Sequence, residues 1–386
     1  MRHTRHEQYK FTVNSKMEQT HPTSSPLPSL HDRPPCVLLV VTDLEIGGTP
    51  LQVYRLAGAL HDLGVKVHVT CLAGWGPVAG KIRALGVPVT PLGARGVWDI
   101  AVGLRLRRLI RQIKPDICHS FLMHSNVLVR LAAGIRRRPK IVSTICTVER
   151  EKGWHMTLER WTARLADRIV CISQAVRTFC LTRGLPADRL VVIHPGIDLD
   201  RIRTAIPGDP VALGLTPSTT RLCYLGRLDP VKNIDVILRA LTLLARPDLE
   251  LLIIGDGPQR PELETLARDL MLTNQVRFLG FREDYPSLLK LCRIFCLASR
   301  QEGWGIAVSE ALTADLMVVA TNVDALPEQV RSNNEGVLVD PDDPKAFAQG
   351  ILSVLTPPNP PNPRTVQTTQ TEAQEYLHLY RQLLAF

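Results

Sequence analysis

The chain has 386 residues, of which 45% are hydrophobic and 22% charged, the balance expected of a globular protein. Its length predicts two or three domains. No apolar run reaches the roughly 18 residues that a membrane-spanning helix needs. The net charge of +9 does not predict a nucleic-acid partner, because aromatic residues make up only 5% of the chain and none alternate with the arginines.

The first 34 residues are polar and rich in Pro, Ser and His, and they lack the apolar core of a secretion signal. They predict a disordered N-terminal tail. The nine cysteines form no C-x-x-C pair, and most lie inside apolar runs, which favours buried reduced thiols and a cytoplasmic setting. Cys292 and Cys296 have no second cluster of ligands to join them, so no metal site is predicted.

Short apolar segments alternate with helical segments over residues 35–203, which predicts a first domain. The expected strands lie at 36–41, 65–70, 87–89, 117–120, 140–147 and 168–173. The expected helices lie at 50–63, 99–113, 126–134 and 157–167. This alternation is typical of a parallel sheet covered by helices on both faces.

Residues 204–219 contain several prolines and predict a linker, after which the alternation restarts over a second domain at 220–363. Its expected strands lie at 222–226, 251–255, 276–279, 292–298, 317–321 and 336–339, and its expected helices at 231–244, 261–271, 285–291, from 306 onward, 327–331 and 344–355. A Pro-rich connection at 357–363 precedes a last helix at 371–384, within a separate segment 364–386. The predicted fold class is α/β, with two Rossmann-like, doubly wound domains facing across a cleft that holds the ligand.

Two glutamates, Glu302 and Glu310, bracket a Gly-Trp-Gly turn that leads from an apolar strand into an apolar helix. Glycines before a helix N-terminus let an anion approach unpaired backbone N–H groups. A glycosidase pair is less suitable, because eight helical residues would separate the carboxyls by about 12 Å rather than the 5–9.5 Å of such enzymes. Taken alone, this spacing is more often a loop charge and a solvated helix residue.

Other strand-end turns carry residues that suit a phosphorylated ligand. Gly226 and Arg227 end one strand, and Lys232 follows five residues after the arginine, so that two cations can clamp a diphosphate. Taken alone, these are more often solvated loop cations. Gly47 and Gly48 form a similar turn in the first half, but without the G-x-G-x-x-G spacing and the later acidic residue of a dinucleotide-binding dehydrogenase.

Together these turns resemble the retaining glycosyltransferases of family 4, also called glycosyl transferases group 1, which have the GT-B fold. The resemblance covers roughly residues 36–386, and its motifs are more specific in the second half than in the first. The matching residues are Gly47-Gly48, His119-Ser120, His124-Ser125-Asn126, Ser173, His194-Pro195-Gly196-Ile197-Asp198, Gly226-Arg227-Leu228 with Lys232, Gly255-Asp256-Gly257-Pro258, Leu279-Gly280-Phe281, Glu302-Gly303-Trp304-Gly305 with Glu310, and Asp324-Ala325-Leu326-Pro327-Glu328.

The resemblance implies a role for each of these positions. Arg227 and Lys232 would bind the donor diphosphate, and Glu302 would hold hydroxyls of the donor sugar, so that these three form the catalytic set. Glu310 would hold the ribose hydroxyls. Gly47 and Gly48 would close over the diphosphate from the other domain, and Phe281 and Arg282 would flank the base. The remaining donor-binding positions would be Gly226 and Gly257, together with Gly303, Trp304, Gly305 and Ile306, which offer backbone N–H groups. The last helix would cross back to brace the first domain.

Three positions depart from the family pattern. The family often carries a His after the strand at 140–145, where this chain has Cys146, and a thiol does not reproduce the hydrogen bonds of an imidazole. His119 and His124 are the alternatives on the acceptor side, although a lone His at a strand end is more often structural. Asn233 and Asp315 stand where the family often has glycine.

The resemblance therefore implies a metal-independent retaining hexosyltransferase that moves a sugar from a UDP- or GDP-linked donor to a carbohydrate or lipid-linked acceptor in surface polysaccharide, lipopolysaccharide or glycolipid synthesis. It needs no cofactor beyond the nucleoside-diphosphate sugar, which is a co-substrate. The alternative is a catalytically inactive nucleotide-sugar-binding or scaffold relative of the same fold. Basic segments at 99–111 and 136–140 suggest contact with an anionic membrane, and hence a cytoplasmic protein peripheral to the inner membrane face; a solvated helix face is the simpler interpretation.

Overall fold

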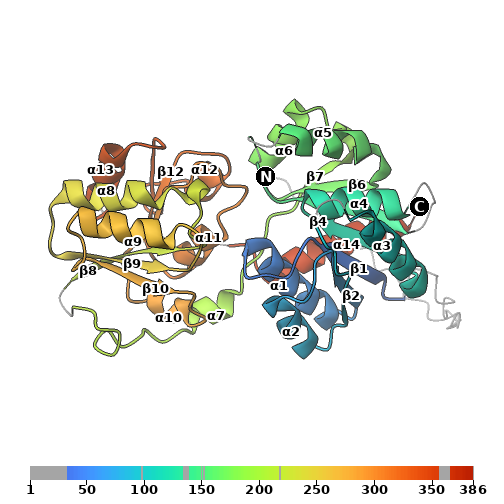
Figure 1. Ribbon diagram of the computed structural model, residues 1–386, viewed down its shortest axis with the longest axis horizontal. Coiled ribbons are helices and arrows are strands. Elements are labelled where there is room, and N and C mark those ends of the chain that lie inside the picture. Colours follow the sequence, from blue (N-terminus) through green and yellow to red (C-terminus); the bar gives the residue numbers. More distant parts are fainter. Residues whose placement is uncertain are drawn as a thin grey trace, which may run out of the picture. The chain divides into compact units, whose positions relative to one another are not determined.

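The computed structural model describes residues 33–385, except 97–98, 134–138, 149, 151–152, 217–218 and 356–365. Residues 1–32 of the predicted tail, the Pro-rich connection at 357–363 and most of the basic segment 136–140 lie outside the described residues. Within them, the chain forms two parallel sheets, each with helices packed against it (Figure 1). The predicted α/β class with two Rossmann-like sheets is confirmed.

The first sheet has seven strands in the order β3-β2-β1-β4-β5-β6-β7. The strands are β1 (Cys36–Val41), β2 (Lys66–Cys71), β3 (Val89–Pro91), β4 (Ile117–Phe121), β5 (Lys140–Ile145), β6 (Arg168–Cys171) and β7 (Leu190–Val192). The helices are α1 (Gly48–Asp62), α2 (Pro77–Ala84), α3 (Ile100–Ile113), α4 (Met123–Ala133), α5 (Gly153–Thr162), α6 (Gln174–Thr182) and α7 (Leu199–Arg203).

The side chains of β1 show why helices cover both faces of this sheet. Val37, Leu39 and Val41 join the apolar cluster formed with α1 and α2, whereas Leu38 and Val40 join the cluster formed with α3 to α6. Successive residues of a strand point to opposite faces, so a strand that is apolar throughout needs a partner layer on each side. The continuous apolar run of β1 therefore produces a three-layer domain.

The second sheet has six strands in the order β10-β9-β8-β11-β12-β13, with β8 (Thr220–Leu225), β9 (Leu249–Ile254), β10 (Val276–Gly280), β11 (Ile294–Leu297), β12 (Met317–Thr321) and β13 (Gly336–Val339). Its helices are α8 (Ile234–Leu244), α9 (Arg260–Asp269), α10 (Tyr285–Leu289), α11 (Ile306–Thr313), α12 (Leu326–Gln329) and α13 (Pro344–Leu355). Side chains from α8, α9, α11 and α13 complete one apolar core around the sheet.

Both sheets reverse their strand order at one point, between β1 and β4 in the first and between β8 and β11 in the second. In doubly wound sheets the ligand binds outside the carboxyl ends of the strands at such a reversal. The turns after β1, β8 and β11 contain Gly47, Arg227 and Glu302 respectively. The topology therefore brings the strand-end motifs to the two edges where ligands are expected.

The last helix, α14 (Thr369–Leu384), packs on α1 and belongs to the core of the first sheet, not the second (Figure 1). Tyr376 and Tyr380 on this helix are fully buried there. Glu372 of the same helix accepts hydrogen bonds from Gln52 and from the backbone N–H of Gly196. Burial raises the pKa of this carboxyl to about 8.

Some predicted elements are wrong in extent, and the backbone explains two of them. The helix predicted at 231–244 begins only at Ile234, because Asn233 adopts the left-handed conformation with φ 55°. Asp315, between α11 and β12, has φ 64°. Asn and Asp are among the few non-glycine residues that adopt this conformation readily, so both can replace the family's glycine. The helix predicted at 157–167 instead spans Gly153–Thr162, and no helix was predicted at α2 or α6.

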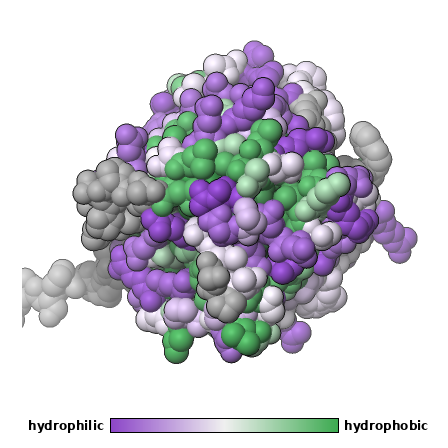
Figure 2. All heavy atoms as spheres, turned by 90° about the vertical axis from the view of Figure 1, so that its left-hand side faces the viewer, coloured by the Kyte–Doolittle hydropathy of each residue, from purple (hydrophilic) through white to green (hydrophobic). Residues whose placement is uncertain are grey.

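No described helix combines the length and the apolar character that crossing a bilayer requires. Figure 2 shows one face of the molecule, on which hydrophobic residues form patches between hydrophilic ones. Scattered exposed apolar residues are normal for globular proteins. Among the largest exposures are those of Ile100 (85%) and Leu104 (67%), which lie one turn apart on α3.

Candidate active site

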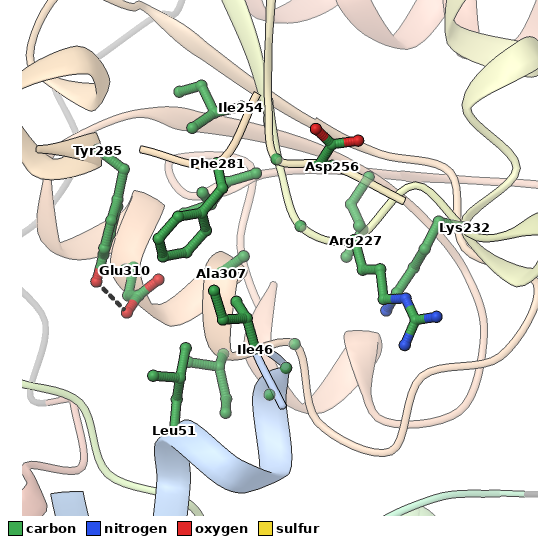
Figure 3. Close-up of a pocket in the computed structure, with 18 of the residues that line it drawn as sticks. Ile46, Leu51, Arg227, Lys232, Ile254, Asp256, Phe281, Tyr285, Ala307 and Glu310 are labelled. Atoms are coloured by element: carbon green, nitrogen blue, oxygen red, sulfur yellow. Dashed lines mark hydrogen bonds between the residues drawn. The ribbon is translucent and has the colours of Figure 1, made fainter. Parts of the chain in front are cut away.

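A pocket of about 430 Å³ lies at the two reversal points and is lined from both halves of the chain. The first half contributes the turn after β1 and the face of α1. The second half contributes the turns after β8, β9, β10 and β11 and the start of α11. Figure 3 shows Arg227 and Lys232 on one side of this pocket and Tyr285 and Glu310 on the other. Its lining residues therefore come from the carboxyl ends of strands, as the fold requires.

Lys232 and Glu302 form an ion pair inside the pocket, with 2.7 Å between Nζ and Oε2. Both side chains are largely buried, at 22% and 12% exposure. The hydroxyl of Ser299 donates to the same carboxylate oxygen at 3.2 Å, and the backbone N–H of Glu302 donates to Asp324 at 2.9 Å. These contacts hold the carboxylate in one orientation beside the ammonium group. Two of the three predicted catalytic residues are thus neighbours.

Arg227 is the more accessible of the two predicted cations, with its side chain 60% exposed. Its Nε lies 3.0 Å from a carboxylate oxygen of Asp229, while its backbone carbonyl accepts a hydrogen bond of 2.7 Å from the hydroxyl of Tyr224. Gly226 has φ 154°, and a Cβ there would lie 2.9 Å from that hydroxyl. The glycine therefore permits the turn that presents Arg227 to the pocket.

Glu310 lies on α11 and is held by residues of both halves. The hydroxyl of Tyr285 donates to Oε1 at 2.7 Å, and Nη2 of Arg55 on α1 donates to the same oxygen at 3.0 Å. The side chain of Glu310 is only 6% exposed. Burial and the neighbouring Glu310 carboxylate raise the pKa of Tyr285 well above its usual value, so its phenol remains a donor.

Phe281 and Arg282 follow β10 and also line the pocket. The ring of Phe281 is 44% exposed and offers an apolar surface. The guanidinium of Arg282 forms two hydrogen bonds, of 2.7 and 2.6 Å, with Asp284, and these raise its pKa. Arg282 is therefore paired within its own turn.

Two backbone N–H groups at the glycine turn before α11 already donate hydrogen bonds within the protein. The N–H of Gly305 donates to Gln329 at 2.9 Å, and that of Ile306 donates to the carbonyl of Trp304 at 2.9 Å. Both N–H groups thus have protein partners, which departs from their predicted role. Trp304, Gly305 and Ile306 nevertheless line the pocket, as do Gly47, Gly48 and Gly226.

Gly257 and Gly303 were predicted to bind the donor but do not line the pocket. A Cβ on Gly257 would lie 2.6 Å from the backbone of Leu228. A Cβ on Gly303 would lie 2.2 Å from the carbonyl oxygen of Cys146 in the first half. No side chain fits at either contact, so both glycines serve close backbone packing.

The three predicted acceptor-side residues also lie outside the pocket lining. Both ring nitrogens of His119 are hydrogen-bonded, to Tyr380 at 2.6 Å and Thr144 at 2.7 Å, and burial lowers its pKa to about 3. His124 packs with its ring centroid 5.3 Å from that of His155. Burial raises the pKa of Cys146 to about 12, so its thiol is not a base near neutral pH.

The structure brings a different histidine, His194, to the glycine turn. Its ring stacks on Trp304 with 4.4 Å between centroids, and Nδ1 donates to the carbonyl of Ile172 at 3.0 Å. Arg55 and Tyr285 are further pocket residues that the sequence analysis missed. The spacing of Gly47, Leu51 and Arg55, one residue every four along α1, was the available signal, because such residues share one helix face.

Two Rossmann-like sheets with one shared pocket at their strand ends define the GT-B class of glycosyltransferases. Residues 46–201 match the model described as Glycosyltransferase Family 4, and residues 210–370 match that of Glycosyl transferases group 1. The chain belongs to the family 4 glycosyltransferases, which use nucleotide sugars and retain the anomeric configuration.

Two relatives illustrate the range of the family. The chain is 27% identical over 291 residues to the UDP-Gal:alpha-D-GlcNAc-diphosphoundecaprenol alpha-1,3-galactosyltransferase of Escherichia coli, covering 71% of this chain and 75% of the relative. It is 35% identical over 204 residues to the D-inositol 3-phosphate glycosyltransferase of Mycobacterium sp. (strain JLS), covering 50% of this chain. That second match spans only 45% of the mycobacterial protein.

Solved structures show the same fold at low sequence identity. Anabaena HepE, solved in complex with UDP-glucose, superposes with a TM-score of 0.74 at 21% identity, over 90% of this chain and 98% of that one. A glycosyltransferase from Rickettsia africae gives a TM-score of 0.75 at 18% identity, over 91% and 99% of the two chains. At these identities the similarity demonstrates the architecture alone.

Proposed function

We propose that this chain transfers a sugar from a UDP- or GDP-linked donor to a carbohydrate or lipid-linked acceptor, in the synthesis of surface polysaccharide, lipopolysaccharide or glycolipid. The observation that carries the proposal is the placement of four of the charged residues that line one pocket: Arg227, Lys232 and Glu302 lie at one side, and Glu310 lies at the other. A nucleoside-diphosphate sugar has its anionic diphosphate between two hydroxyl-bearing sugars, which matches this arrangement. The E. coli relative, which is named for a UDP-Gal donor and a lipid-diphosphate acceptor, supports both the donor class and the acceptor class of the proposal.

The donor fits the pocket as follows. Arg227 and Lys232 bind the diphosphate, for which a guanidinium and an ammonium are suitable partners. The carboxylate of Glu302 then accepts hydrogen bonds from the sugar hydroxyls, and that of Glu310 from the ribose. Phe281 gives the base an apolar surface.

The two cations act on the step in which the diphosphate leaves. The bond between the sugar's anomeric carbon and the phosphate oxygen breaks, and a bond to the acceptor oxygen forms on the same face. The acceptor's proton passes to the departing phosphate, so no separate base is required where the family's His is replaced by Cys146. Negative charge grows on the phosphate during this step, and it is stabilised by Lys232, which is largely buried, and by the more exposed Arg227.

Binding of the nucleotide is the first test. In a thermal-shift screen with UDP, GDP and ADP, we expect one diphosphate to raise the unfolding temperature, since a ligand at 100 times its Kd stabilises the folded state by about 2.7 kcal/mol. Transfer is then measured with sugars of that nucleotide. If no diphosphate stabilises the protein, the proposal is wrong. Binding without transfer or hydrolysis of any tested sugar would favour the inactive relative.

We further propose that α3 contacts an anionic membrane surface from which a lipid-linked acceptor is taken. Its exposed face contains Ile100, Leu104, Arg107, Arg108 and Arg111, which are spaced so that they share one side of the helix. Exposed apolar side chains beside arginines suit the boundary between lipid headgroups and acyl chains. The two large exposed apolar residues favour this interpretation over a merely solvated face.

Sedimentation with vesicles tests the membrane contact. We expect the protein to sediment with phosphatidylglycerol vesicles at low salt but not with phosphatidylcholine vesicles, and salt should release it. Each basic residue near such a surface contributes about 1 kcal/mol, so loss of two of them in Arg107→Glu with Arg111→Glu should lower binding by about 30-fold or more. Leu243→Ser, at an exposed apolar position on α8, is the control. Equal sedimentation of both variants would rule out α3 as the contact.

A further inference from the structure

Arg55 makes an ion pair that joins the two halves of the chain inside the pocket. It lies on α1, two turns after the Gly47-Gly48 turn, and its Nη2 is 3.0 Å from Oε1 of Glu310 on α11. The two side chains are only 12% and 6% exposed. Arg55 also lines the pocket itself. This pair is therefore a part of the site and not a surface contact.

The carboxylate of Glu310 has its two oxygens in different surroundings. Oε1 accepts from Arg55 at 3.0 Å and from the Tyr285 hydroxyl at 2.7 Å, and the same Arg55 nitrogen lies 3.4 Å from that hydroxyl. Two donors on one oxygen fix the plane of the carboxylate. An ionised carboxylate has about four lone-pair sites, so acceptor capacity remains on Oε2 for hydroxyl groups of a ligand.

We propose that Arg55 is a positioning residue for nucleotide recognition, which orients Glu310 so that its second oxygen meets the ribose hydroxyls of the donor. This rests on the proposed function, in which Glu310 holds the ribose. Because Arg55 and Glu310 belong to different halves, ribose recognition is complete only when the halves are in contact. The glycine turn and Arg55 lie on one helix, so α1 serves both the diphosphate end and the ribose end of the pocket.

Several other contacts join the two halves, which argues against a purely structural role for Arg55. Lys81 on α2 pairs with Glu283, and Arg150 pairs with Asp324. The carboxylate of Glu328 accepts from the backbone N–H groups of Gln174 and Ala175 at the start of α6. Removing Arg55 leaves all of these in place, so its loss is expected to affect ribose recognition more than contact between the halves.

The test compares how wild type and variants discriminate ribose from deoxyribose. Binding of UDP and GDP and of their 2′-deoxy and 3′-deoxy counterparts is measured by calorimetry for wild type, Arg55→Met and Arg55→Lys. Wild type should prefer the ribonucleotide by about tenfold or more, as expected for a hydrogen bond to a charged group. Arg55→Met should reduce that preference to within about threefold, and Arg55→Lys, which keeps the charge but not the forked geometry, should retain an intermediate preference.

Lys81→Met is the matched control, since it removes another ion pair between the halves without touching Glu310. It should keep the wild-type preference. If Arg55→Met or Arg55→Lys weakens ribonucleotide and deoxynucleotide binding by the same factor, Arg55 has only a structural role and the inference is wrong. If the wild-type protein binds no nucleotide, the proposed function itself is wrong, which is a different result from failure of the Arg55 inference alone. The Arg55→Lys comparison still decides if Arg55→Met does not fold.

Discussion

Replacing Lys232 with Ala is expected to lower kcat by about 10²–10³-fold. The ammonium group lies 2.7 Å from Glu302 in a largely buried site. In the proposed reaction it faces the charge that develops on the leaving diphosphate. A donor aimed at developing charge contributes mainly in the transition state, so kcat should fall more than KM rises. Steady-state kinetics with the nucleotide sugar identified by binding would measure this.

Glu302→Gln is the companion variant and should lower turnover by about a hundredfold, because an amide is a weaker acceptor for sugar hydroxyls and no longer pairs with Lys232. The double variant should lose less than the product of the single losses, since the two residues act as a unit. Lys345→Ala, at an exposed position on α13, is the control and should behave as wild type. Near-normal rates in both single variants would show that neither Lys232 nor Glu302 is a catalytic residue.

Replacing Arg130 with Met is expected to lower the free energy of unfolding by about 3–5 kcal/mol. Arg130 is fully buried on α4, and its Nη1 lies 2.5 Å from the carboxylate of Glu159 on α5, whose side chain is 3% exposed. Nε donates to Ser143 on β5 at 3.1 Å. The variant would leave the Glu159 carboxylate buried without its cation, which is the costly outcome for such a pair.

Denaturant unfolding followed by tryptophan fluorescence would measure this loss. The double variant Arg130→Met with Glu159→Leu is the informative control, because replacing both partners of a buried ion pair by apolar residues is often nearly neutral. It should therefore recover much of the stability lost in the single variant. A loss below about 1 kcal/mol in Arg130→Met would show that water or another group replaces the pair.

Most of the order of elements was predictable, because most strands are short and apolar and most helices have their own periodicity; the helices α2 and α6 were not predicted. Element limits were less predictable where one residue's conformation decides them. Asn233 and Asp315, which stand where the family often has glycine, both adopt the left-handed conformation, which Asn and Asp tolerate better than most other residues with a side chain. The residue types alone do not show which Asn or Asp adopts that conformation.

The candidate site was predictable to the extent that it follows strand ends. Gly226, Arg227, Lys232, Glu302 and Glu310 all lie in or beside such turns, and the structure collects them in one pocket. The histidine predictions fared differently. His119 also follows the pattern of a strand end, but α14 covers it. Its Nδ1 is hydrogen-bonded to the hydroxyl of Tyr380, which is 261 residues away in sequence. Burial by a distant helix leaves no local signal in the chain.

The sequence by itself determined the family, the alternation of strands and helices, and the charged residues at the strand ends, because each depends on neighbours within one turn or one strand. Only the tertiary structure decided which of these residues meet. The contact of Arg55 with Glu310 joins positions 255 residues apart, and that of Cys146 with Gly303 joins two backbones. Such contacts depend on how two sheets and a returning helix pack together, and no local pattern encodes that packing.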